Sequence, residues 1–157
     1  MNDLNLNELL QFSHVVEEHI EVTDADLIER IIIGTYDCGT YDTNSHIRSA
    51  SRFTSHDIAM RVMEITLEKN QDVIDEWLKW NNGARTIIRA TFSKPIGHGF
   101  VKGTSFKHSY AMHRCVIVLE ADAHYRSYRI ITAYPAPNKA VNQAIFEDRQ
   151  NFYANRR

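Results

Sequence analysis

The sequence has few of the residues that build disulfide scaffolds, zinc sites or membrane spans. Only two cysteines occur in 157 residues, Cys38 and Cys115, which excludes a disulfide framework and a four-cysteine zinc site. A single disulfide between them stays open, while the apolar run around Cys115 is typical of a buried thiol. No apolar run is long enough to cross a membrane, and the N-terminus lacks a basic segment followed by an apolar one. These absences predict a chain without membrane insertion and without an export signal of its own.

The sequence also lacks net positive charge and the common nucleotide-binding motifs. Its formal charge is −2, so any contact with a nucleic acid must depend on a local basic patch. Neither a GxGxxG nor a P-loop pattern occurs, and the eight histidines show no HExxH spacing. The sequence therefore predicts no nucleotide-binding sheet, no metal site and no cofactor.

What is present is an ordinary globular composition, 43% apolar and 24% charged, on a chain long enough for one domain. The spacing of apolar residues predicts four helices in the first half, over about 7–20, 23–33, 54–69 and 71–80. Capping boxes are predicted at Thr23 with Asp26 and at Thr54 with Asp57. Residues 34–51 show no period and are typical of a long surface loop.

From Arg85 onward the composition favours strands. These are predicted in "RTIIRATF", in the glycine-bearing "PIGHGFVKGT", in "HRCVIVLEA" and in "YRSYRIITAYP", the last two forming a hairpin. Helices first and antiparallel strands afterwards indicate the α+β class. In the final strand, regular alternation places Tyr128, Ile130, Thr132 and Tyr134 on one face. The segment after Pro137 is either a helix that packs on the domain or a partly ordered tail.

Four polar residues stand out on local grounds. His19 lies beside the apolar stripe of its predicted helix, Arg30 lies on the next helix, and Thr132 and Tyr134 end the final strand. Each also has a purely structural interpretation, since histidine caps helices, arginine is common on surfaces, and threonine and tyrosine are common in strands. Periodicity alone does not decide between a site and a scaffold.

Four segments, in their order, resemble the bacterial ribonuclease A-like toxin domains at the C-termini of contact-dependent growth inhibition proteins. They are "HVVEEHIEVTDADLIERI", "SASRFTSHDIA", "NQDVIDEWL" and "IITAYPAP". The resemblance implies a ribonuclease A-like fold in a single domain over 1–157, with its core at about 8–137 and a C-terminal extension at about 138–157. The sequence departs from the family pattern at "QFSHVV", where Gly-Gly usually precedes the first histidine.

In that family the active site consists of a histidine, an arginine, and the threonine and tyrosine of the final strand, which match His19, Arg30, Thr132 and Tyr134. The resemblance implies metal-independent cleavage of RNA, in which the ribose 2′-hydroxyl attacks its neighbouring phosphorus and leaves a 2′,3′-cyclic phosphate. His19 would act as acid or base, and Arg30 would stabilise the phosphorane. The two hydroxyl groups would donate hydrogen bonds to its nonbridging oxygens.

RNA is the expected substrate, with transfer RNA as one candidate. His14 is expected to contact it, as is Lys102, which forms a candidate basic patch with Lys94 and Lys107. The resemblance also implies a cognate immunity protein that blocks the active site. It implies delivery as part of a larger secreted toxin that acts in the cytoplasm of the target cell.

Other function classes stay open at this point. The chain fits a catalytically silent protein-binding module, related to an immunity protein, whose acidic surface covers a basic partner. It also fits an RNA-binding fold without turnover, although its aromatic residues do not form the sheet pattern of a typical RNA-recognition module. An independent cytosolic protein would have the same sequence features.

Overall fold

The structure is a computed structural model that describes residues 5–11, 13–33, 49–80, 84–122 and 127–154. Its helices are α1 (Leu6–Leu9), α2 (Val15–His19), α3 (Asp24–Ile33), α4 (His56–Lys69), α5 (Gln71–Trp80) and α6 (Lys139–Ala154). Its strands are β1 (Ser49–Phe53), β2 (Arg85–Thr91), β3 (Gly97–Val101), β4 (Tyr110–Met112), β5 (Arg114–Asp122) and β6 (Ser127–Ala136). Within the described ranges, every helix is too short or too polar to span a bilayer.

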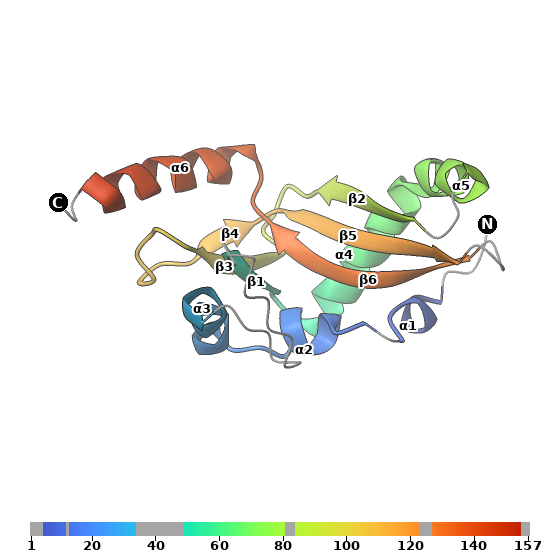
Figure 1. The fold of residues 1–157 in the computed structure, drawn as a ribbon, viewed down its shortest axis with the longest axis horizontal. Coiled ribbons are helices and arrows are strands. Elements are labelled where there is room, and N and C mark those ends of the chain that lie inside the picture. The colour runs from blue at the N-terminus through green and yellow to red at the C-terminus, as the bar shows by residue number, and fades with distance from the viewer. Residues whose placement is uncertain (1–4, 12, 34–48, 81–83, 123–126, 155–157) are drawn as a thin grey trace.

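The strands form two antiparallel sheets, which confirms the predicted α+β class (Figure 1). One sheet has the order β1-β3-β4 and the other has the order β2-β5-β6. The predicted hairpin is present as β5 and β6. The two sheets meet where backbone hydrogen bonds join the start of β5 to its neighbours, for example from His113 N to the carbonyl oxygen of Ala136 at 3.0 Å.

The N-terminal helix predicted over 7–20 is wrong, because two short helices, α1 and α2, occupy this region. Both the backbone N–H and the hydroxyl of Ser13 donate to the carbonyl oxygen of Leu10, at 2.9 and 3.0 Å. A serine side chain that competes for a helical carbonyl in this way ends the helix. After this break α2 begins as a separate helix, and His19 is the last residue of that helix.

The helix starts were predicted with mixed success. The capping box of α3 is confirmed, with Asp26 N donating to Thr23 Oγ1 at 3.2 Å and Thr23 N donating to Asp26 Oδ2 at 3.3 Å. The box predicted at Thr54 is wrong, because Ser55 caps α4 by accepting from Ile58 N at 3.2 Å. The N–H of Thr54 instead donates to the carbonyl oxygen of Ile96.

The long loop predicted over 34–51 is wrong at its end, where Ser49 to Ser51 belong to β1 and pair with β3. A glycine permits this pairing, since a Cβ on Gly99 would lie 2.5 Å from the carbonyl oxygen of Ala50. Residues 34–48 lie outside the described part of the chain, and so does Cys38. Cys115 is a free thiol at 0% exposure, and burial raises its pKa to about 12.

Two apolar cores hold the elements together. The main core lies between α4 and one face of the β2-β5-β6 sheet, and includes Phe53, Met63, Leu67, Ile88, Ile117, Leu119 and Ile130. Helix α4 is seen behind this sheet in Figure 1, so the face toward the viewer is the opposite one. The second core joins α3 to β1 and β3 through Val22, Leu27, Ile31, Ala50 and Phe100. These two cores fix α2 and α3 beside the end of β6.

A β-bulge interrupts the pairing of β6 with β5. Val118 pairs with Thr132, whereas the next residue of β5, Leu119, pairs with Ile130. Ile131 is therefore an extra residue opposite a regular strand, which is the definition of a bulge. The bulge residue lies three residues before Tyr134, where the predicted alternation ends, and it changes which side chains share a face.

The prediction that Ile130, Thr132 and Tyr134 share one face is wrong for this reason. Ile130 and Ala133 both lie in the main core, with 1% and 0% exposure. Thr132 and Tyr134 are half-buried and lie on the opposite face, away from α4. Without the extra residue, an unbroken period of two would bury Thr132 together with Ile130.

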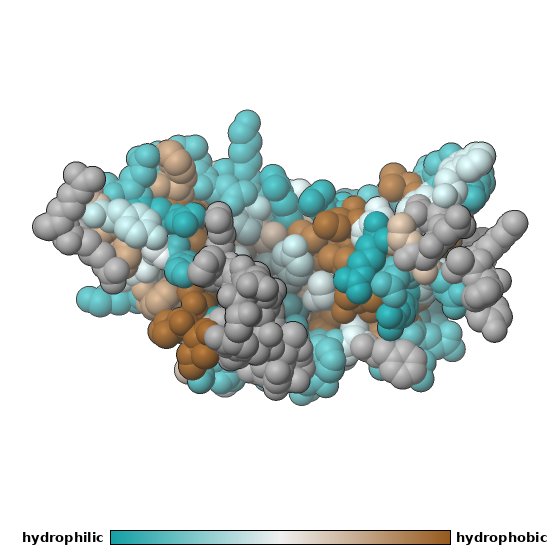
Figure 2. Space-filling model, in the orientation of Figure 1, coloured by the Kyte–Doolittle hydropathy of each residue, from teal (hydrophilic) through white to brown (hydrophobic). Residues whose placement is uncertain are grey.

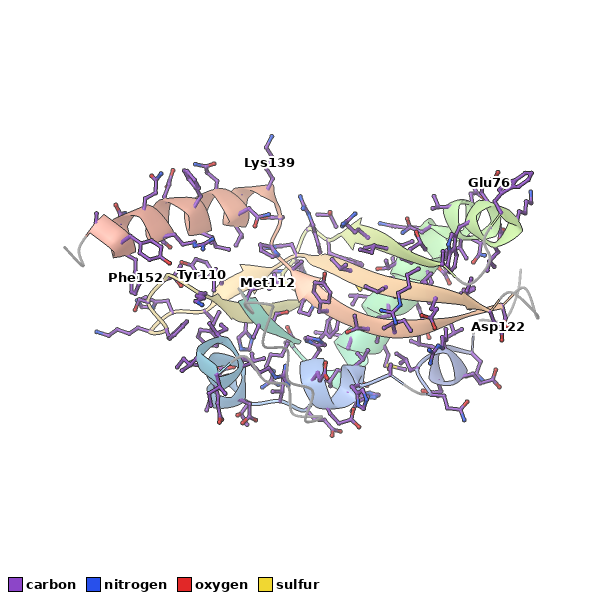
Figure 3. All side chains as sticks on the ribbon, viewed as in Figure 1. Glu76, Tyr110, Met112, Asp122, Lys139 and Phe152 are labelled. Atoms are coloured by element: carbon purple, nitrogen blue, oxygen red, sulfur yellow. The ribbon has the colours of Figure 1, made fainter. Side chains whose placement is uncertain are left out.

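Helix α6 packs at the far end of the β1-β3-β4 sheet. The hydroxyl of Tyr110, on β4, donates to Asp148 Oδ2 at 2.6 Å, and Ile145 is the buried residue of the helix. Figure 3 shows Phe152 on the side of α6 that faces Tyr110. The segment after Pro137 is thus a helix that packs on the domain, one of its two predicted forms.

Candidate active site

A cleft of about 620 Å³ lies on the face of the β2-β5-β6 sheet that is turned away from α4. It is lined by His14, Glu18, His19, Arg30, Ser49, Ala50, Ser51, Arg85, Ile131, Thr132 and Tyr134. The four residues singled out in the sequence, His19, Arg30, Thr132 and Tyr134, are all among them. They come from α2, α3 and β6, so the cleft brings together elements from the beginning and from the later part of the sequence. Its size suits a small organic or nucleotide ligand.

His19 is held in one orientation by the backbone of β1. Its Nδ1 lies 2.9 Å from the carbonyl oxygen of Ser51, and a carbonyl only accepts, so Nδ1 carries the proton. Nε2 is then the basic nitrogen and lies 3.9 Å from Glu18 Oε2. The neighbouring residues Val15 and Ile20 are buried in the main core and fix the helix that carries the ring.

Burial lowers the pKa of His19 below its ordinary value of 6.5. The hydrogen bond to Ser51 and the charge of Glu18 act in the opposite direction, and the positive charge of Arg30 adds to the lowering. The residue is 8% exposed, so loss of hydration of the charged ring is the largest effect. The ring is therefore neutral near pH 7 and able to accept a proton.

Arg30 places a buried positive charge in the same cleft. The residue is 2% exposed, and its Nη1 donates to the carbonyl oxygen of Glu18 at 2.5 Å. Its helix, α3, is fixed by Leu27 and Ile31 in the second core. A guanidinium stays charged when buried and can bind two oxygens of a phosphate, so this position suits an anionic ligand.

Thr132 and Tyr134 bring two hydroxyl groups to the opposite wall. Both line the cleft because the bulge at Ile131 turns them away from the core. The ring centroids of Tyr134 and His19 are 5.9 Å apart with an interplanar angle of 41°, which is direct aromatic contact. The end of β6 and the end of α2 thus face each other across the cleft.

Ser51 connects these two walls. Its carbonyl oxygen binds His19, and its hydroxyl donates to the carbonyl oxygen of Pro135 at 2.8 Å. Pro135 follows Tyr134 directly, so one buried serine of β1 positions both the histidine and the strand that carries the tyrosine.

The two predicted substrate contacts have different positions. His14 lies at the start of α2 and lines the cleft, with Nδ1 at 3.8 Å from Glu17 Oε2. Lys102 lies on the turn after β3, is exposed, and does not line the cleft. Among the described residues, no group of three or more His, Cys, Asp or Glu side chains is placed to hold a metal ion.

A family model decides what the chain is related to. The model of the bacterial CdiA-CT RNAse A domain matches residues 13–135. The chain belongs to this family. The crystal structure of the CdiA-CT/CdiI complex from Y. kristensenii 33638 is similar, with 26% sequence identity, a TM-score of 0.64, and coverage of 80% of this chain and 100% of that chain. A comparison with curated proteins finds no match.

The family is one of ribonuclease toxins, and the match confirms the resemblance seen in the sequence. The family match runs from just before His14 to Pro135 and includes the whole cleft. Helix α6 lies beyond it. The sequence did not predict four of the polar residues that line the cleft, namely Glu18, Ser49, Ser51 and Arg85. Only the position of Glu18 next to His19 gave a signal in the sequence.

Proposed function

We propose that this chain cleaves RNA without a metal ion, by attack of a ribose 2′-hydroxyl on the adjacent phosphorus. The bond from the 2′-oxygen to phosphorus forms, the bond to the 5′-oxygen breaks, and a 2′,3′-cyclic phosphate remains. The observation that carries the proposal is the fixed His19 ring, with Nδ1 bound to Ser51 and the basic Nε2 available, facing the tyrosine of β6. DNA lacks the 2′-hydroxyl and is not cleaved.

His19 acts as the general base. Its neutral form is favoured by burial, and Nε2 takes the proton of the 2′-hydroxyl as that oxygen attacks. Glu18 Oε2, at 3.9 Å, then stabilises the imidazolium that forms. The backbone hydrogen bond to Ser51 persists through both protonation states, so the ring does not have to turn.

Arg30, Thr132 and Tyr134 stabilise the negative charge that develops on the phosphorane. The guanidinium supplies a full charge from one wall of the cleft, and the two hydroxyl groups supply hydrogen bonds from the other. We assign Tyr134 the role of a hydrogen-bond donor and not that of a proton shuttle.

His14 supplies the proton to the departing 5′-oxygen. It lines the same cleft, its side chain is 59% exposed, and its Nδ1 lies 3.8 Å from Glu17 Oε2. Histidine is the side chain that can both hold and release a proton near neutrality. The sequence alone predicted a substrate-binding role for His14, and its position in the cleft supports this second role.

A cognate immunity protein is the proposed protein partner. The similar Y. kristensenii structure is a CdiA-CT/CdiI complex, and a protein that covers the cleft would block access to His19. We also propose that the chain is delivered to a target cell as part of a larger secreted protein and acts there in the cytoplasm. Both proposals follow from family membership.

The test is incubation of the purified chain with total bacterial RNA in EDTA, with analysis of the product ends. Total RNA contains transfer RNA together with the other RNAs, so the products also show which RNA is cleaved. Cleavage that leaves 2′,3′-cyclic phosphate supports the proposal, and His19→Ala should lower the rate by about 10² to 10⁴. His108→Ala removes an exposed histidine outside the cleft and is the matched control. Equal loss in both variants, or cleavage only with added metal, contradicts the proposal.

The role of His14 has its own test. His14→Ala should slow cleavage of an RNA phosphodiester by about 10²-fold. It should have much less effect on a nucleoside 3′-aryl phosphate, whose phenolate leaving group departs without a proton. An equal effect on both substrates means that His14 binds substrate and does not donate the proton.

A further inference from the structure

The open face of the β2-β5-β6 sheet continues from the cleft in regular rows of side chains. Arg85 pairs with Glu120, and Glu120 with Arg129, across the three strands. The next row is formed by Ile87, Val118 and Thr132. Side chains of directly paired residues lie on the same face, so these rows share the face that carries the cleft.

We call this surface the sheet-face tract. It consists of Arg85, Ile87, Arg89, Val118 and Arg129. Arg85 is itself a lining residue of the cleft, so the tract is continuous with it. Ile87 is 47% exposed, which is unusual for a large aliphatic residue in the middle of a strand. Figure 2 shows apolar surface in the hollowed part of this face, with hydrophilic residues around it.

The charges of the tract are mostly positive, although the whole chain is weakly acidic. Arg85 Nε lies 2.8 Å from Glu120 Oε2, and Arg129 Nη2 lies 2.7 Å from Glu120 Oε1. Two guanidinium groups thus share one carboxylate. Arg89 is exposed, and its side chain has no ion pair with any residue in the described part of the chain. The three arginines of the tract outnumber the neighbouring carboxylate of Glu120, and this excess of positive charge favours the binding of a polyanion at this face.

We propose that the sheet-face tract binds an unpaired stretch of RNA next to the phosphate that is cleaved. This inference rests on the proposed function and adds to it the class of substrate, which is RNA in single-stranded form. Ile87 and Val118 contact the face of one base, while Arg85 and Arg89 contact the phosphates on its two sides.

The apolar row is what selects unpaired RNA. The faces of bases are hidden inside a duplex and become accessible only in loops, bulges and ends. A flat apolar strip with arginines beside it therefore matches an unstacked base with its phosphates, as in other single-strand binding surfaces. Arginine alone would bind a duplex as well, because phosphate contacts carry no information on pairing.

The test measures binding and not cleavage. The probe is a fluorescent single-stranded oligoribonucleotide with 2′-O-methyl groups throughout, which has no free 2′-hydroxyl and cannot be cleaved by this reaction. Its affinity for the wild-type chain is measured at several salt concentrations and compared with the affinity of Arg89→Gln, Ile87→Ser and Arg61→Gln. Arg61 is exposed on α4, behind the sheet, and is the matched control for loss of one charge.

Arg89→Gln should lower the affinity at least about threefold and reduce the slope of log K against log salt by about 0.7, the value for one lost phosphate contact. Ile87→Ser should weaken binding of the single strand without changing that slope. It should leave unchanged the affinity for the duplex that the same probe forms with its complementary strand. Arg61→Gln should behave as wild type. Thermal unfolding shows whether each variant is folded, and Ile87→Thr replaces Ile87→Ser if the serine variant is not.

Unchanged affinity and slope in both tract variants would overturn the inference and leave the face to a protein partner. Equal weakening of single-stranded and duplex RNA by Ile87→Ser would also overturn it. Because the probe cannot be cleaved, these outcomes are independent of the catalytic proposal, which fails separately if wild-type chain does not cleave ordinary RNA.

Discussion

The Nδ1 atom of His19 lies 2.9 Å from the carbonyl oxygen of Ser51, which is 32 residues later in the chain. This hydrogen bond selects the tautomer whose Nε2 is basic, and burial favours the neutral ring. A carbonyl partner contributes no negative charge, in contrast to a carboxylate partner. The ring is therefore oriented without a large increase in its pKa.

The first prediction concerns pH. Because the pKa of His19 is lowered in the folded chain, the acid limb of kcat/KM for RNA cleavage should have its midpoint below 6.5, as expected for a base that must be neutral. The unfolded chain binds this proton more readily, so the contribution to stability is fully present above pH 6.5 and is lost as the pH falls through the folded pKa. Rate profiles and an NMR titration of the His19 ring check both statements. A midpoint above 6.5 would mean that Glu18 dominates over burial.

The second prediction concerns the hydroxyl groups of β6. Tyr134→Phe keeps the ring that contacts His19 but removes the proposed donor to the phosphorane, so kcat should fall by about 10²-fold. KM should change little, because the hydrogen bond strengthens only in the transition state. Thr132→Ser, which keeps its hydroxyl, should retain most of the activity that Thr132→Val loses. Single-turnover kinetics measure these changes, and a rise in KM alone would assign the hydroxyls to ground-state binding.

The third prediction concerns the bulge. Ala133 is fully buried in the main core, whereas Thr132 lines the cleft. Ala133→Asp should lower the free energy of unfolding by about 3 kcal/mol or more, because it buries an unpaired charge. Thr132→Asp should cost less than about 1 kcal/mol. Urea denaturation of both variants gives the comparison, and the reverse order would mean that β6 pairs with β5 without the extra residue.

The fourth prediction concerns the attachment of α6. Burial and the hydrogen bond to Asp148 raise the pKa of Tyr110 to about 12. This interaction stabilises the neutral phenol, so its contribution is present below pH 10 and is lost as the pH rises toward 12. Tyr110→Phe should speed amide hydrogen exchange in α6 and cost about 1 kcal/mol locally. Exchange rates in α4 should stay as in wild type, and a matching increase there would show that α6 supports the whole fold.

The sequence predicted the elements well where the pattern was local. The capping box at Thr23, the helix α5 and the hairpin of β5 and β6 all depend on residues close in the chain. The sequence did not predict elements that form only because a segment distant in the chain pairs with them. Ser49 to Ser51 form a strand only because β3 lies beside them, and no period in their own segment shows this.

The candidate site shows the same division. The four residues taken from the family resemblance do lie together in one cleft. Strict alternation in β6 would have placed Thr132 with Ile130 in the core, and a bulge cannot be found in a single sequence because it depends on the register with β5. Ser51 was missed for a related reason, since its backbone carbonyl binds His19 and its hydroxyl binds Pro135, and both partners are distant in the sequence.

The cleft also sets when activity can exist during the life of the chain. Its two walls come from segments that are far apart in the sequence, α2 and α3 on one side and the last strand on the other. Ser51 forms hydrogen bonds with His19 on one wall and with Pro135 on the other. A chain that is still being synthesised, or one that is held unfolded during transport, has no histidine with a fixed tautomer and no opposing hydroxyls. If the proposed function holds, cleavage of RNA is possible only once the last strand, β6, is in place.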